Sequence, residues 1–236
     1  MNPDAAPVLV EPQASVVGTH LRTPRAAAVA GIVFSILLIT SLWLLRLSVP
    51  TDLSDVGPWL QISAERASLA LNLVPFAGVA FMWFLGVLRD RLGAREDRFF
   101  ATVFLGSGLM FLGMMFVAAA VGGGIVRAYA AAPATQTNDA AFAFARALSY
   151  GLMHIYAFKM ASVFMITTST LAIRTRIAPA WIAWLGYAAA AFLLFGSGFL
   201  DWVLFVFPGW VLLLSIYILL DNLHGASPAT AGPSIC

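Results

Sequence analysis

The sequence predicts an all-helical membrane bundle with six transmembrane helices and both termini in the cytoplasm. Three observations support this fold class. Hydrophobic residues make up 61% of the 236 residues and charged residues only 10%, whereas soluble domains carry about 25% charged residues. Apolar runs long enough to cross a bilayer, about 20 residues each, recur along the chain. Arginine and lysine are distributed unevenly among the intervening loops, and that asymmetry indicates orientation.

Each predicted span follows from an apolar run and its polar boundaries. Residues 1–24 are rich in Pro, Ala and Val and are predicted to form a disordered cytoplasmic tail. Pro58 is expected in the first turn of a short interfacial helix, and Asn138 or Asp139 is expected to cap the fourth helix. Residues 222–236 are predicted to be a flexible cytoplasmic tail. The six-helix domain, residues 25–221, has predicted spans at 26–45, 67–88, 99–121, 147–173, 180–199 and 203–220.

Glycine, proline and one aspartate are predicted to interrupt the apolar runs. Gly122, Gly123 and Gly124 are expected to break the helix after the third span. The segment 181–220 carries a single charged residue, Asp201, and forty residues are too many for one crossing, so a turn is expected beside Asp201. Pro208 is expected to kink the last span.

The sidedness follows from counting basic residues on the two sides of a six-span chain. The side that holds both termini carries twice as many arginines as the other, which makes it cytoplasmic. If the last forty residues formed one re-entrant span instead, the C-terminus would lie outside. On the cytoplasmic side are Arg22, Arg25, Arg89, Arg91, Arg95, Arg98, Arg174 and Arg176, and on the other side are Arg46, Arg66, Arg127 and Arg146.

Lys159 is the first candidate for a functional residue. It lies within the predicted fourth span, about 18 Å from Ala147 at 1.5 Å per residue, near the middle of a ~30 Å hydrocarbon core. A charged residue at that depth is costly and should face the bundle or a wet cavity. The amine could be deprotonated there, reach Asp201, or bind an anionic ligand or lipid. The simpler interpretation is an amine satisfied by carbonyls, hydroxyls and water.

His154 is the second candidate, and it shares a helical face with Tyr150, whereas Tyr156 lies beside Lys159. A proton relay or quinone contact and a hydrogen-bonded packing role are both open for this histidine. We predict no metal site and no cofactor, because one intramembrane histidine cannot form a bis-histidine haem or a His-based metal site. Cys236 is the only cysteine, so no intrachain disulfide is expected.

Helix directions suggest that several polar residues collect in the outer half of the bundle. Asn72 and Asp201 are both expected toward the outer leaflet, with His154 about 10 Å below the start of its span. We therefore hypothesise a small polar vestibule that opens outward and has Lys159 at its floor. This arrangement requires the second, fourth and fifth spans to be neighbours.

The loop between the second and third spans carries a further motif. In Gly86-Val87-Leu88-Arg89-Asp90-Arg91-Leu92-Gly93-Ala94-Arg95, six positions resemble the loop that joins helices two and three in major facilitator transporters. The resemblance implies that Asp90, Arg91 and Arg95 form a charge relay at the cytoplasmic surface. Arg89 and Ala94 depart from that pattern, and the alternative is a basic loop that enforces topology. In composition, the whole chain resembles multi-pass inner-membrane proteins common in high-GC bacteria.

No recognisable catalytic set emerges, so the function predicted first is a non-enzymatic accessory or partner-binding subunit of the bacterial cytoplasmic membrane. Small residues such as Gly31 and Gly186 would pack against a second copy or a partner protein. Membrane lipids are expected partners, and nucleic acid is not. The alternative is a small transporter or half-transporter for an anionic solute that uses Lys159 and the vestibule. A lipid or quinone enzyme would need a carboxylate beside His154.

Overall fold

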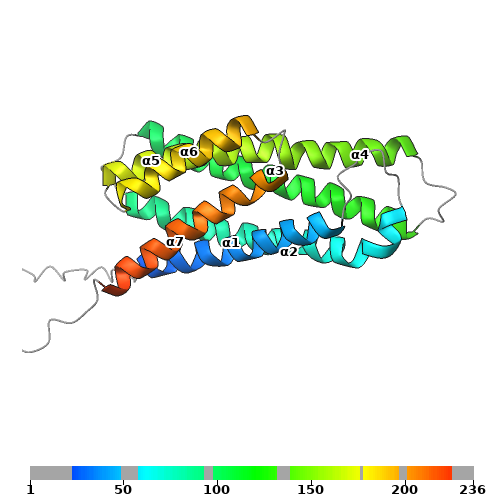
Figure 1. The fold of residues 1–236 in the computed structure, drawn as a ribbon, viewed down its shortest axis with the longest axis horizontal. Coiled ribbons are helices and arrows are strands. Elements are labelled where there is room, and N and C mark those ends of the chain that lie inside the picture. Colours follow the sequence, from blue (N-terminus) through cyan, green and yellow to red (C-terminus); the bar gives the residue numbers. More distant parts are fainter. Residues whose placement is uncertain are drawn as a thin grey trace, which may run out of the picture.

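The structure, a computed structural model, describes residues 23–48, 58–92, 98–131, 139–175, 178–196 and 201–224, and every regular element in these ranges is helical (Figure 1). This confirms the all-helical fold class. The described elements are α1 (Thr23–Ser48), α2 (Pro58–Leu92), α3 (Arg98–Ala131), α4 (Asp139–Gly151), the π-helical η2 (Leu152–Ala157), α5 (Phe158–Thr175), α6 (Ala180–Gly196), the 3₁₀-helical η3 (Asp201–Phe205) and α7 (Val206–His224).

Five helices among the described residues are long and apolar enough to cross a membrane. The fourth of them is continuous through α4, η2 and α5, and we call residues 139–175 the long rod. Helix α6, with 17 residues, is at the short end of the range that spans a bilayer. The five qualifying segments are Ala26–Ser48, Ser63–Arg89, Phe99–Ala131, Ala140–Thr175 and Trp202–Leu223.

Several helix boundaries differ from the predicted spans. Pro58 is the first residue of α2 itself, a helix of 35 residues, and so belongs to α2 and not to a separate interfacial helix. Proline fits at this position because the first helical N–H groups have no partner within the helix. Helix α4 begins at Asp139, and Asn138 lies outside the described residues. Of the two predicted tails, 23–24 belong to α1 and 222–224 to α7, while 1–22 and 225–236 lie outside the described residues.

The prediction that three consecutive glycines end the third span is wrong, because Gly122, Gly123 and Gly124 all lie inside α3. A Cβ atom built on Gly122 would meet Leu71 of α2 at 3.3 Å and Ser149 of α4 at 3.6 Å. The absence of a side chain therefore allows close packing of three helices. That packing offsets the intrinsic cost of glycine in a helix, about 1 kcal/mol relative to alanine.

Pro208, which is expected to kink the last span, lies near the start of the helix that contains it. Helix α7 begins at Val206, so Pro208 falls in its first turn, after the 3₁₀ turn η3. The first N–H groups of a helix lack an intrahelical acceptor, and a proline there removes no hydrogen bond. The proline therefore lies where a helix starts, and the chain changes helix type just before it.

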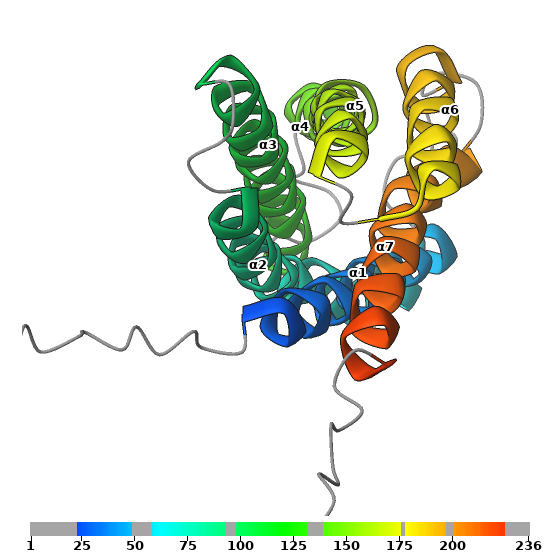
Figure 2. The ribbon, with the colours of Figure 1, turned by 90° about the vertical axis from the view of Figure 1, so that its left-hand side faces the viewer.

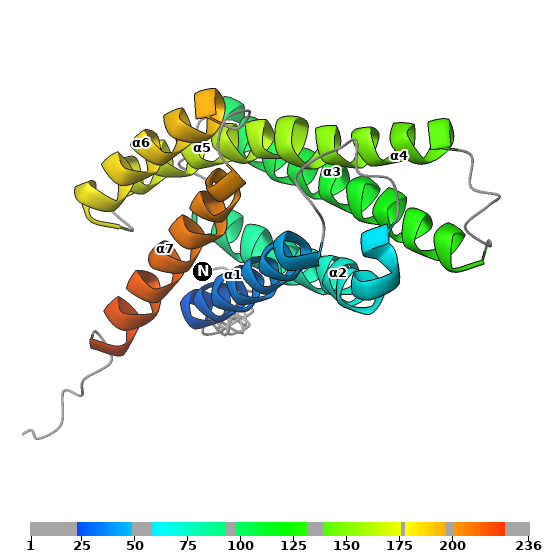
Figure 3. The ribbon, with the colours of Figure 1, turned by 45° about the vertical axis from the view of Figure 1, so that its right-hand side comes forward.

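The helices pack as an antiparallel bundle, and α1 begins at the same end at which α7 finishes (Figure 1). Helix α1 packs between α2 and α7, α3 packs between α2 and the long rod, and α6 contacts both α5 and α7. Figure 2 shows this arrangement along the bundle, with α1, α2 and α7 on one side and α3, α5 and α6 on the other. At the opposite end from the termini, α3 and α4 extend past the end of α1 (Figure 3).

Single polar contacts join neighbouring helices. The Ser41 hydroxyl donates to the Ala70 carbonyl at 2.7 Å, linking α1 to α2. The Thr170 and Tyr187 hydroxyls lie 2.7 Å apart and link α5 to α6. The Trp210 indole N–H donates to the Ile182 carbonyl at 3.3 Å, which links α7 to α6. Such interhelical hydrogen bonds each contribute about 0.6 kcal/mol in membranes.

The small-residue faces expected to bind a partner are buried within the chain. A Cβ atom on Gly31 would lie 2.1 Å from the Ser215 Oγ atom of α7, and one on Gly186 would lie 2.1 Å from the Ser169 Oγ atom of α5. Ala27, Ser35 and Ala190 are fully buried as well. These residues bring α1 against α7 and α6 against α5, which is the use of small residues at membrane helix contacts. The prediction that they form an external interface is therefore wrong.

The centre of the bundle is filled by phenylalanine rings from α1, α2, α3, α5 and α7. Phe207 is fully buried, and its ring centroid lies 4.8 Å from that of Phe111 and 5.9 Å from that of Phe34. Such ring pairs favour tilted and edge-on arrangements. We call this group the phenylalanine cluster: Phe34, Phe81, Phe84, Phe104, Phe111, Phe158, Phe164 and Phe207.

The outside of the bundle is apolar. Phe76, Trp83, Trp184 and Phe195 are each at least 67% exposed. A soluble monomer rarely exposes large contiguous apolar patches, whereas a bilayer solvates such a surface. The described surface is thus that of a multi-pass membrane protein.

Candidate functional site

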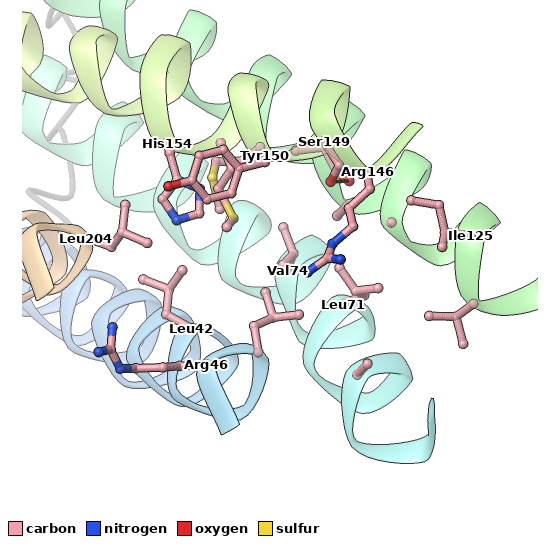
Figure 4. A pocket seen from close by; sticks show the side chains of 18 of the residues that line it. Leu42, Arg46, Leu71, Val74, Ile125, Arg146, Ser149, Tyr150, His154 and Leu204 are labelled. Atoms are coloured by element: carbon pink, nitrogen blue, oxygen red, sulfur yellow. Dashed lines mark hydrogen bonds between the residues drawn. The ribbon is translucent and has the colours of Figure 1, made fainter. Parts of the chain in front are cut away.

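A pocket of about 170 Å³ lies at the end of the bundle away from the termini (Figure 4). It is enclosed by the last turns of α1, the first half of α2, the second half of α3, the long rod and η3. Most of its lining is aliphatic. The polar side chains in the lining are Arg46, Arg146, Ser149, Tyr150 and His154.

The long rod contributes one polar wall. Arg146, Tyr150 and His154 recur every four residues, so they lie on one helical face. Arg146 is 8% exposed and His154 is 9% exposed. The rings of Tyr150 and His154 are stacked, with centroids 3.8 Å apart and planes 15° apart. Ser149, which lies between Arg146 and Tyr150 in sequence, donates its hydroxyl to the Ala118 carbonyl at 2.9 Å, which fixes this wall against α3.

His154 lies within the π-helical turn η2. A π turn accommodates an extra residue in a helix, and such turns are common at functional sites. On the N-terminal side of η2 the rod carries the pocket residues. On its C-terminal side, Phe158 and Phe164 point into the phenylalanine cluster. The turn therefore sets the angle between the polar wall of the pocket and the apolar core.

Arg46 forms the opposite polar wall, at the end of α1. Its guanidinium carbon lies 4.6 Å from the centroid of the Trp202 ring, within the range of a cation–π contact. Trp202 in turn packs against Trp43 and Phe205, with centroids 5.9 and 5.7 Å apart. This aromatic group orients the Arg46 side chain and is typical of a membrane–water boundary.

The floor of the pocket is apolar and closed. Leu71, Val74 and Met115 line it. Phe111 lies one turn before Met115 in α3 and belongs to the phenylalanine cluster. Its ring centroid lies 5.5 Å from that of Phe81. The pocket is therefore a blind site that ends at the cluster.

The chemistry of the described lining is cationic and hydrogen-bond donating. The Arg146 guanidinium, a phenol, a hydroxyl and an imidazole project from walls that are otherwise aliphatic. Arg46 also lines the pocket, with its guanidinium directed toward Trp202 and away from Arg146 (Figure 4). Among the described residues, no group of three or more His, Cys, Asp or Glu side chains could hold a metal ion. The arrangement suits a ligand that is apolar over most of its surface and has an anionic end.

The structure brings Tyr150 and His154 together at this pocket but places Lys159 elsewhere. Lys159 is exposed on the outside of the bundle, so the prediction that it faces the interior is wrong. The reason is the register of α5. Phe158 and Phe164 occupy the inward direction, and Lys159, about 100° from Phe158 around the helix, is turned outward.

The structure does not bring the described vestibule residues together at this pocket. Asn72 is exposed on α2 and is not among the residues that line the pocket with His154. Tyr156, expected beside Lys159, is 57% exposed on the rod and does not line the pocket either. Asp201 is the first residue of η3, and its side chain is outside the described part of the structure. Of the three expected vestibule residues whose side chains are described, Asn72, His154 and Lys159, only His154 lines the pocket.

The loop motif is described in part. Asp90 and Arg91 belong to the last turn of α2, and Arg95 lies outside the described residues. The side chains of Asp90 and Arg91 are likewise not described. The charge relay implied by the major facilitator resemblance thus stays a prediction.

Arg46 and Arg146 were missed as candidate site residues, since their sequence positions were interpreted only as markers of membrane topology. For Arg146 a signal was available in the sequence. Arg146, Tyr150 and His154 follow one another at intervals of four residues, and this spacing predicts that they share a helical face. Arg46 carried no such signal. Its place at the pocket depends on how α1 packs against α2 and on the position of η3, which are tertiary features.

Comparisons with protein-family models, with curated proteins and with solved structures found no match.

Proposed function

We propose that this chain is a non-enzymatic binding subunit of a bacterial cytoplasmic membrane, with six crossings and both termini in the cytoplasm. The six antiparallel passes of the bundle support an even number of crossings, because α1 starts where α7 ends (Figure 1). At 17 residues, α6 would be about 26 Å long, enough for one crossing with slight thinning of the bilayer. The distribution of arginines supports the cytoplasmic placement of the termini.

One observation carries the binding role: a pocket with a polar rim ends blindly against a close-packed aromatic core. The pocket lining reaches Met115, and the rings of Phe111, Phe81 and Phe207 fill the space beyond, with centroids 4.8 to 5.9 Å apart. Interiors packed in this way leave no room for water or solute. A molecule in the pocket would be held there and would have no path across the bundle.

The alternative of an anionic-solute transporter loses the feature on which it was based. That hypothesis placed Lys159 at the floor of a vestibule, and Lys159 is exposed on the outer wall of α5. Counting from Arg174, at the other end of that helix, Lys159 lies about 22 Å into a ~30 Å hydrocarbon core. Lysine side chains in helices point toward the helix N-terminus, so the amine can reach the nearer head groups by snorkelling.

The binding role is tested by filling the pocket. Ala119 lines the pocket, and the next residue, Ala120, is exposed on the outside of the same helix. Native mass spectrometry of the full chain, purified from its own membrane in a neutral detergent, measures which small molecules stay bound. We expect a bound species in the unmodified chain and in Ala120→Phe, and its loss in Ala119→Phe.

Two outcomes would refute the binding role. One is an unmodified chain that carries no small molecule after purification. The other is an Ala119→Phe variant that keeps the molecule as well as Ala120→Phe does. Circular dichroism of both variants establishes that each retains its helices, because inserting a ring into a packed site can cost 1–3 kcal/mol, roughly.

A further inference from the structure

We infer that the pocket binds the head group and upper chain of an anionic amphiphile, a lipid or fatty acid whose head carries phosphate or carboxylate oxygens. This inference rests on the proposed binding role and names the class of ligand. It follows from three properties of the pocket taken together: its depth in the bilayer, the chemistry of its rim and the character of its walls.

The depth of the pocket follows from helix lengths. The Arg174 guanidinium carbon lies 4.6 Å from the centroid of the Phe100 ring, and this pair marks one boundary of the hydrocarbon core. At 1.5 Å per residue, His154 is about 30 Å from Arg174 and Arg146 about 42 Å. The hydrocarbon core is ~30 Å thick, and head groups extend the bilayer to ~40–45 Å. The pocket therefore begins at the acyl chains and reaches the head groups.

The position of Arg46 supports the same depth for the pocket by a separate argument. Arg46 lies close to the end of α1, with Trp43 and Trp202 beside it. Tryptophan is enriched at membrane interfaces. Both guanidinium groups of the pocket thus lie where a bilayer presents phosphate and carboxylate groups.

The rim chemistry favours an oxyanion. A guanidinium has five N–H donors arranged as a planar fork that matches phosphate and carboxylate oxygens. Each arginine can keep a present contact, such as that of Arg46 with Trp202, and still donate to a ligand. Tyr150 supplies a further hydroxyl group in the lining, whereas the Ser149 hydroxyl donates to the Ala118 carbonyl.

The walls favour an acyl chain over a free ion. Leu42, Leu71, Val74 and Met115 line the lower part of the pocket, and a hydrated phosphate would find no hydrogen-bond partner among them. A volume of about 170 Å³ is close to the ~150 Å³ of an engineered apolar cavity that binds benzene. The pocket therefore accommodates one segment of a chain, with the remainder in the surrounding bilayer.

The test uses the full-length protein in a neutral detergent and follows its thermal unfolding by tryptophan fluorescence. Three probes are titrated: dihexanoyl phosphatidylglycerol, dihexanoyl phosphatidylcholine and inorganic phosphate. A ligand that binds only the folded state raises the melting temperature, and above its Kd the rise grows with the logarithm of its concentration. We expect such a rise with phosphatidylglycerol, a much smaller one with phosphatidylcholine, and none with inorganic phosphate at matched ionic strength.

Arginine variants assign the effect to the pocket. Arg46→Gln and Arg146→Gln should each weaken the apparent affinity for phosphatidylglycerol about tenfold, the loss of one charged hydrogen bond. The matched controls are Arg66→Gln and Arg127→Gln, two arginines near the same end of the bundle that are exposed and do not line the pocket. These should leave the affinity unchanged. If Arg146→Gln does not fold, Arg146→Lys and Arg46→Gln decide the question.

Four results would overturn the inference: no rise with phosphatidylglycerol, an equal rise with phosphatidylcholine, an equal rise with inorganic phosphate, or equal losses in the pocket and control variants. The third would identify a free-anion site. This failure is distinguishable from failure of the binding role. If the unmodified chain retains a neutral molecule that Ala119→Phe loses, the binding role stands and the anionic class is wrong.

Discussion

Replacing Phe207 with alanine should destabilise the bundle more than any change of similar size on its outer surface. Phe207 is fully buried, and its ring centroid lies within 6.1 Å of those of Phe34, Phe81, Phe111 and Phe164. As the second residue of α7, it joins the last helix to four others, α1, α2, α3 and α5. Removing it therefore affects the whole bundle.

The expected cost of Phe207→Ala follows from these contacts. Each aromatic pair contributes about 0.5 kcal/mol or more beyond burial, so four pairs give about 2 kcal/mol. The cavity that remains adds a further cost in lost dispersion. Lipid is as apolar as the core, so the transfer contribution that operates in water is small. We expect a loss of about 3 kcal/mol, at the low end of the ~3–5 kcal/mol found for Phe→Ala in soluble cores.

Reversible unfolding in mixed micelles, followed by circular dichroism against the mole fraction of dodecyl sulfate, measures this loss. Phe195→Ala is the matched control, because Phe195 is 77% exposed on α6 and should change stability by less than about 0.5 kcal/mol. Phe207→Leu, which fills part of the space, should fall between the two. If Phe207→Ala costs no more than Phe195→Ala, the cluster does not hold the helices together.

Three further predictions concern the helix contacts, the lysine and the topology. Gly31→Ala should lower the free energy of unfolding by roughly 1–3 kcal/mol, because the added Cβ would meet Ser215. Gly113→Ala should be neutral, because nothing lies within 4 Å of its added Cβ. Equal melting temperatures for the two variants would contradict the close packing of α1 against α7 at Gly31. Lys159→Met should shift stability by less than about 0.5 kcal/mol because the side chain is exposed, and a loss above about 2 kcal/mol in the same unfolding assay would show an interior role. A membrane-impermeant maleimide should label Cys236, the only cysteine, after permeabilisation and not in intact cells, whereas labelling of intact cells would place the C-terminus outside.

The sequence was sufficient for the fold class, because twenty apolar residues in a row have few stable alternatives to a helix in lipid. It was insufficient wherever packing overrides local preference. Gly122 breaks helices in isolation, yet it lies inside α3 because Leu71 and Ser149 pack against it. The starting residue of the fourth helix also mattered. A span counted from Ala147 puts Lys159 at mid-depth, whereas counting back from Arg174 puts it near one interface.

The candidate site could be predicted only in part. The four-residue spacing of Tyr150 and His154 is visible in the sequence, and both residues line the pocket. The direction of the Lys159 side chain depends on which face of α5 packs against the phenylalanine cluster. Six apolar helices can pack with many different faces inward, so the sequence alone does not determine that direction. Arg46 reaches the pocket through the packing of α1 and η3 with the long rod. No local pattern encodes that relation.

The π turn at Leu152–Ala157 lets the long rod hold one residue more than a regular helix would between the pocket and the core. Each residue turns an α-helix by about 100°, so in a regular helix that extra residue would rotate Arg146 and Tyr150 away from the direction they now have relative to Phe164. Deleting one residue within the turn should therefore restore regular winding and leave both groups facing as they do now. Deleting one residue from a regular part of the rod between them would instead turn the polar wall away from the pocket.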